Sequence, residues 1–170
     1  MARGVGAHRI SVEDAERLQR FHAEAYARFV SQVRPLPGAR ELLERLARLK
    51  VPHAIATSGR LESASPALKI LGISEHCPVI TRDLVRHAKP DPDLFLAAAE
   101  KLGVSIHQSV VIGDSVWDLL AARRARALGI GLLSGGYGEE ELERADAYRV
   151  YQDPADLLMH LDEVGVRTLD

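Results

Sequence analysis

Apolar residues at helical spacing dominate the first third of the chain. A run that recurs every three or four positions comprises Ala15, Leu18, His22, Ala25 and Phe29. Ser11 precedes this run and Asp14 lies three residues later, a capping-box pattern that marks a helix start. The pattern predicts one long amphipathic helix over about 11–32, which Pro35 and Pro37 terminate.

Beyond a second predicted helix, whose apolar face carries Leu42 and Leu46, the periodicity changes. Short apolar runs bounded by turn residues span 51–57, 78–81, 109–112 and 127–133. Helix-like segments span about 60–71, 91–103, 116–126 and 138–145, and a last helix is expected over about 154–163. Near-continuous apolar strands that alternate with helices indicate an α/β fold, a Rossmann-like parallel sheet with helices on both faces.

Composition narrows the class of protein. The 170 residues are 46% hydrophobic and 27% charged, which suits one globular domain with a small appendage. The net charge of -2 argues against nucleic acid or an anionic membrane as the main partner, and no apolar run approaches the ~20 residues of a membrane helix. Cys77 is alone, which favours a reducing, cytoplasmic compartment. Residues 1–10 lack the hydrophobic region of a secretory signal and read as a leader.

Small polar residues follow several of the predicted strands. Thr57 and Ser58 end one strand and Asp114 ends another, with Asp118 four residues later. Ligands bind beyond the carboxyl ends of parallel strands, where hydroxyl and N–H donors suit phosphate and paired carboxylates suit Mg²⁺. The alternative for each residue is helix capping, with Asp118 as a first-turn residue that faces the helix dipole.

Lys89 lies between two strands, in the segment His87-Ala88-Lys89-Pro90-Asp91-Pro92-Asp93. The two prolines stiffen a loop that enters the next helix. A lysine on such a loop can pair with a phosphate or a carboxylate as a point charge. A single loop lysine is more commonly just solvated, so its significance depends on the residues near it.

Together these segments resemble the haloacid dehalogenase-like superfamily of phosphohydrolases. Its second motif ends a strand in Thr or Ser, as Thr57 does here. Its third motif is a Lys, matched by Lys89-Pro90-Asp91-Pro92, and its fourth is Gly-Asp-x-x-x-Asp, matched by Gly113 to Asp118. Order and spacing also agree, and the run over 132–138 resembles phosphoglycolate-phosphatase-like members.

The resemblance implies a chemical task for each matching residue. Thr57 and Lys89 would be catalytic, and both, with the backbone N–H of Ser58, would bind the transferring phosphate. Asp114 and Asp118 would hold Mg²⁺. The implied activity is hydrolysis of small phosphorylated metabolites through an aspartyl-phosphate intermediate. A mutase or a dehalogenase remains possible within the family, although dehalogenases need no Mg²⁺ and usually lack the acidic pair.

One motif of the family has no match. Its first motif, an Asp-x-Asp that supplies the nucleophile, should precede Thr57, but Asp14 is the only aspartate there. The resemblance therefore implies a leader and remnant of a helical cap over 1–34, and a core over 35–170 that lacks its first, central strand. We expect an N-terminally truncated enzyme. The alternatives are a non-catalytic phosphate- and metal-binding relative with a regulatory task, or a misread resemblance; a response regulator does not fit the motif order.

The helix over 11–32 bears on possible partners. Its apolar stripe would lose packing partners if the rest of a cap were absent, and such an exposed face can drive formation of a homodimer.

Overall fold

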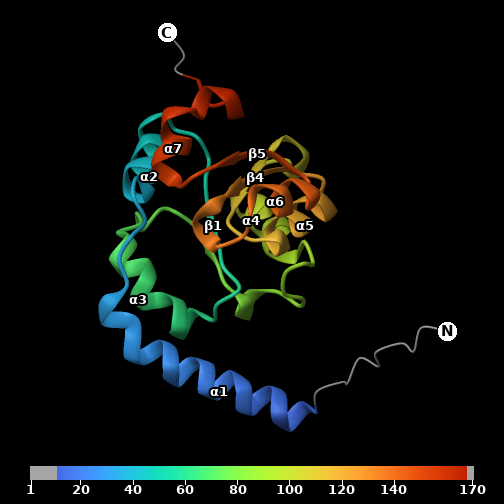
Figure 1. Ribbon diagram of the computed structural model, residues 1–170. Helices are drawn as coiled ribbons and strands as arrows, with labels where there is room; N and C mark the ends of the chain where they lie inside the picture. The colour runs from blue at the N-terminus through green and yellow to red at the C-terminus, as the bar shows by residue number, and fades with distance from the viewer. Residues whose placement is uncertain (1–10, 168–170) are drawn as a thin grey trace, which may run out of the picture. The chain divides into compact units, whose positions relative to one another are not determined.

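The computed structural model describes residues 11–167, so the leader expected over 1–10 lies outside the described residues. Its elements are drawn in Figure 1. The chain divides into two compact units, with the boundary between Val33 and Arg34.

The first unit contains one long helix, α1 (Val12–Phe29), followed by a 3-10 turn, η1 (Val30–Gln32). Ser11 caps it as predicted: its hydroxyl accepts from the Asp14 N–H at 3.0 Å and donates to the Asp14 carboxylate at 2.7 Å. The helix predicted over 11–32 is therefore confirmed. Leu18, Phe21 and Phe29 are each more than half exposed, so an apolar stripe of α1 faces solvent.

The second unit alternates helices with short parallel strands. Its α-helices are α2 (Ala39–Arg48), α3 (Leu61–Leu71), α4 (Asp93–Leu102), α5 (Val116–Ala125), α6 (Glu139–Arg144) and α7 (Pro154–Met159). Its strands are β1 (Ile55–Ala56), β2 (Val79–Ile80), β3 (Val110–Gly113), β4 (Leu128–Leu132) and β5 (Ala147–Tyr151). Its 3-10 turns are η2 (Arg82–Leu84), η3 (Ile106–Gln108), η4 (Leu133–Gly135) and η5 (Leu161–Val164).

Helices cover both faces of the larger sheet. Ile130 and Leu132 of β4 pack in one buried cluster with Leu42 of α2 and Leu157 of α7. On the opposite face the intervening Gly129 and Gly131 leave room for the Leu119 and Leu142 side chains of α5 and α6. The predicted α/β class, parallel strands flanked by helices, is therefore confirmed.

The strands form two separate sheets, which agrees with the expectation of a core that lacks its central strand. β1 pairs only with β2, and β3, β4 and β5 form a separate parallel sheet in that order. Strand β5 was not predicted, because Tyr148 and Arg149 interrupt any apolar run and both are exposed. The run over 51–57 yields only two residues of strand, since Pro52 interrupts it and lacks the N–H a ladder needs.

One face of β3 is unusually open for a parallel strand. Val111 is buried against Phe95 of α4, but Val110 and Ile112 on the other face are 37% and 38% exposed. Among the described residues, no backbone hydrogen bond joins β3 to β1. Both strands therefore have a free edge.

No helix in the described part of the chain combines the length and the apolar character needed to cross a membrane.

Gly38 allows α2 and α7 to begin side by side. It lies at the N-cap of α2 with φ +72°, and a Cβ there would come within 2.4 Å of the Ala155 Cα. The backbone of α7 cannot move aside without disturbing the core that α2 and α7 share.

We expect Gly38→Ala to lower the free energy of unfolding by about 2–4 kcal/mol, from left-handed backbone strain and overpacking together. Urea denaturation measures this. Gly103→Ala is the matched control: Gly103 also has a positive φ (+68°), but a Cβ there would meet nothing within 4 Å. Equal losses in the two variants would contradict the close approach of α2 and α7.

Candidate active site

Lys89 and Asp118 form an ion pair beneath the carboxyl ends of the strands. The Lys89 Nζ lies 2.5 Å from the Asp118 Oδ1, and the two side chains are only 15% and 9% exposed. The same ammonium donates to the carbonyl of Ala56, at the end of β1, at 3.4 Å, and lies 5.3 Å from the centre of the Phe95 ring. Lys89 thus connects the β1 end to the first turn of α5.

The loop that carries Lys89 is held from both sides. At its start the backbone N–H of His87 donates to the Asp93 carboxylate at 2.9 Å, and the His87 ring lies 3.1 Å from the same oxygen. These contacts, above all the backbone hydrogen bond, lower the pKa of Asp93. From α5, the Arg124 guanidinium donates to the Pro90 carbonyl at 3.1 Å. The ammonium position is therefore fixed by a braced loop as well as by its charge partner.

Asp118 is positioned by its own neighbours. Ser115 caps α5, with its hydroxyl accepting from the Asp118 N–H at 3.3 Å and donating to the Asp118 Oδ2 at 2.7 Å. A Cβ on Gly113 would lie 2.3 Å from the Asp118 Cβ, so the glycine before Asp114 provides the space in which Asp118 lies. Lys89 and Ser115 between them engage both carboxylate oxygens of Asp118.

Thr57 and Ser58 lie at the carboxyl end of β1. The Thr57 side-chain oxygen accepts from the Gly59 N–H at 3.1 Å, which leaves its own proton available to donate outward. Ser58 is exposed. Asp83 steadies this turn by accepting from the Leu61 N–H at 2.7 Å, at the start of α3.

Asp114 differs from Asp118 in having a free carboxylate. It is half-buried at the end of β3, and within the described residues its side chain makes no hydrogen bond or ion pair. Gly135 packs against the Asp114 backbone so closely that a Cβ on Gly135 would lie 1.9 Å from the Asp114 carbonyl oxygen. The neighbouring Ser134 Oγ is buried without a hydrogen-bond partner among the described residues.

The structure brings the predicted residues to one edge of the fold. Lys89 and Asp118 are in direct contact, the Ala56 carbonyl that Lys89 also reaches precedes Thr57, and Asp114 begins the same turn as Asp118. No cluster of three or more His, Cys, Asp or Glu suited to a metal occurs within residues 11–167. Asp83 was not singled out from the sequence. Gly113, Gly135 and Asp93 were named there only as members of motifs or segments, because the contacts that give them their supporting roles depend on spatial neighbours.

Comparison with known proteins decides the family. The family model of the haloacid dehalogenase-like hydrolases matches residues 5–126 of this chain. The chain belongs to the haloacid dehalogenase-like hydrolases. This confirms the resemblance inferred from Thr57, Lys89 and the segment from Gly113 to Asp118.

Curated relatives of this family member include phosphatases. A phosphoglycolate phosphatase of Agrobacterium fabrum is 34% identical over 118 residues, which cover 69% of this chain and 51% of the relative. A validoxylamine A 7'-phosphate phosphatase of Streptomyces hygroscopicus subsp. limoneus is 38% identical over 110 residues, which cover 64% of this chain and 51% of the relative. The chain thus spans about half the length of these relatives.

A solved structure of a hydrolase from Pseudomonas syringae shares the fold closely. It is 54% identical, with a TM-score of 0.89, and the match covers 92% of this chain and 73% of that one. The α/β architecture of this family member is thereby confirmed.

We expect Lys89→Met to destabilise the protein by about 3–5 kcal/mol in urea denaturation, because it leaves the Asp118 charge buried without a partner. Adding Asp118→Asn to that variant should recover part of the loss. The matched control is Arg144→Met, which breaks an ion pair with Glu140 whose side chains are 78% and 80% exposed, and should change stability by no more than about 0.5 kcal/mol. Similar losses in the two single variants would show that Lys89 and Asp118 are not a desolvated pair.

Proposed function

We propose that this chain forms the core of a Mg²⁺-dependent phosphomonoester hydrolase whose attacking carboxylate comes from a segment outside residues 1–170. The observation that carries the proposal is the buried Lys89–Asp118 pair beside the β1 end, with the unpartnered Asp114 carboxylate at the neighbouring β3 end. We also infer that residues 1–34 are a leader and part of a helical cap, and that residues 35–170 are a catalytic core without its first strand.

The donors suit a transferring phosphoryl group. The Thr57 hydroxyl and the Ser58 backbone N–H can donate to two phosphate oxygens, and no described residue accepts from that N–H. Lys89 places a largely buried positive charge between the end of β1 and α5. Fixed donors and charges in such surroundings stabilise a transition state without reorganising as the charge develops.

Mg²⁺ fits the residues at the β3 end. The free, half-buried carboxylate of Asp114 is a hard oxygen ligand, and the buried Ser134 Oγ lacks a partner among the described residues. Mg²⁺ needs few protein ligands, since it keeps several waters and binds substrate phosphate. We propose Asp114 as the direct ligand, with Asp118 acting beside it through water. When bound, the ion would supply Lewis-acid polarisation of the phosphate.

The free edges of β1 and β3 support an incoming strand. Ala56 and Val111 pack in the same apolar cluster around Phe95, yet the two strands are not hydrogen-bonded to each other. A segment that paired with both edges would cover the exposed Val110 and Ile112 and deliver a carboxylate toward Lys89. The resemblance implies that this carboxylate is the nucleophile that forms an aspartyl-phosphate.

The substrate class is a small phosphorylated metabolite. The two curated phosphatases differ in the compound that their names give, and a phosphate ester is what those compounds share. The match to phosphatases does not favour the non-catalytic alternative. A cytoplasmic location accords with the lone, buried Cys77.

The chain of 170 residues should not hydrolyse p-nitrophenyl phosphate with Mg²⁺, because no nucleophile is in place. The same chain extended by its upstream reading frame should do so. Asp114→Asn in the extended form should lower turnover by about 100-fold or more. The control is Asp146→Asn, at an exposed aspartate whose side chain makes no hydrogen bond or ion pair with a described residue, and it should leave turnover unchanged.

Two outcomes would overturn the proposal. Turnover by the 170-residue chain that disappears in Asp114→Asn would refute the absence of the nucleophile. An extended form that carries an Asp-x-Asp strand and binds Mg²⁺ but does not hydrolyse phosphate esters would refute the hydrolase.

A homodimer through α1 is the partner we propose for the chain of 170 residues. Leu18, Phe21 and Phe29 recur at helical spacing and all are exposed. Glu13 and Asp14 lie in the first turn and Arg28 in the last, so two antiparallel copies would bring opposite charges together.

Light scattering should therefore give a mass that rises toward twice the monomer mass with concentration. Phe21→Glu should shift the protein toward monomer, since it places a charge in the stripe. Leu84→Glu, at an exposed leucine outside α1, is the control and should leave the mass unchanged. A monomeric mass at all concentrations would refute the dimer.

A further inference from the structure

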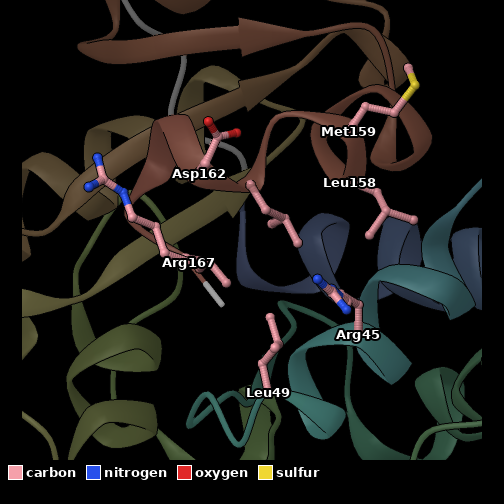
Figure 2. Close-up of a pocket in the computed structure, with 8 residues that line it drawn as sticks. Arg45, Leu49, Leu158, Met159, Asp162 and Arg167 are labelled. Atoms are coloured by element: carbon pink, nitrogen blue, oxygen red, sulfur yellow. The ribbon is translucent and has the colours of Figure 1, made fainter. Parts of the chain in front are cut away.

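A second concave site lies on α2, α7 and η5, shown in Figure 2. Its volume is about 420 Å³, within the range of small-molecule sites. Apolar side chains that line it include Leu49, Leu158 and Val166, of which the last two pack on the buried cluster of α2 and α7.

This cavity and the candidate active site lie at opposite ends of the parallel strands. α2 and α7 begin together, because Gly38 lies against Ala155, just after β5 ends. Arg45 and Leu158 line the cavity from the other ends of these helices. The cavity therefore opens at the edge where the strands begin, opposite the edge that carries Asp114.

Arg45 gives the cavity its chemical character. Its half-buried side chain directs the guanidinium toward the space between Leu49 and Leu158 (Figure 2). No described residue accepts a hydrogen bond from it or pairs with its charge. The exposed Asp162 and Arg167 also line the cavity, and neither makes an ion pair with a described residue. The Arg167 guanidinium is directed away from Leu49 and Leu158 (Figure 2).

The charges discriminate between kinds of anion. Arg45 directs one positive charge into the cavity, and the opposite charges of the exposed Asp162 and Arg167 offset each other at its margin. A monoanion balances that charge, whereas a phosphate dianion would exceed it and meet Asp162. A planar carboxylate also matches the paired donors of a guanidinium.

We propose that this cavity binds a small monocarboxylate with an apolar body, its head group on Arg45 and its chain on Leu49, Leu158 and Val166. This site is separate from the proposed phosphatase site and does not depend on it.

Octanoate is the probe, titrated into the ¹⁵N-labelled chain and followed by amide chemical shifts. We expect saturable shifts confined to α2, α7 and η5, with a Kd of about 1 mM or tighter. Arg45→Met, which keeps the apolar stem, should weaken binding about tenfold. Arg48→Met is the control, because this exposed arginine is on the same helix but does not line the cavity, and it should leave the Kd unchanged.

Two further ligands test the contributions of the carboxylate head group and of the apolar chain to binding separately. Octanol should not produce the shifts if the carboxylate is required, and inorganic phosphate should not produce them if the apolar body is required. Equal affinity for octanol, equal weakening by the two arginine variants, or shifts spread over the whole chain would each overturn the proposal. The dispersion of the variant spectra shows whether each variant is folded.

Discussion

The contact between Lys89 and Asp118 is the constraint on which the site depends. A buried charge is tolerated only when it is paired and hydrogen-bonded, and both conditions are met here by Ser115 and the Ala56 carbonyl. Because Lys89 contacts the end of β1 while Asp118 belongs to α5, the pair links the two separate sheets. The Asp93 and Arg124 contacts that hold the lysine loop therefore also maintain the relation between those sheets.

The sequence indicated where a candidate site should lie, but not which strands pair. Thr57, Lys89 and Asp114 were singled out because each follows a strand or lies in a proline-stiffened loop, and such local chemistry is visible in a sequence. The helices were also predicted well, since their apolar periodicity is long. Strand β5 was missed because an edge strand with exposed Tyr148 and Arg149 carries no apolar run. Which strands pair, and the space that Gly113 and Gly135 provide, depend on spatial neighbours that no local pattern reveals.

Asp114 and Asp118 occupy different environments although they are four residues apart. Lys89 and Ser115 engage both oxygens of Asp118, whereas the Asp114 carboxylate is unpartnered among the described residues. The resemblance implies that both hold Mg²⁺, with Asp118 acting directly or through water, and their different environments favour different roles for the two carboxylates. Asp118 orients the lysine and Asp114 is available to a cation, with the glycines on either side fixing both backbones.

The charge balance at this edge of the fold favours a divalent cation in the proposed chemistry. Asp114, Asp118 and Lys89 together carry a net charge of −1 before any ligand binds. A phosphate group and an attacking carboxylate would add further negative charge within a few ångströms, where Coulomb repulsion in a partly buried site costs several kcal/mol. Lys89 cannot offset all of it, because Asp118 already neutralises its charge. This charge balance therefore supports the proposal that Mg²⁺ is part of the site, with the Asp114 carboxylate as the group best placed to hold it.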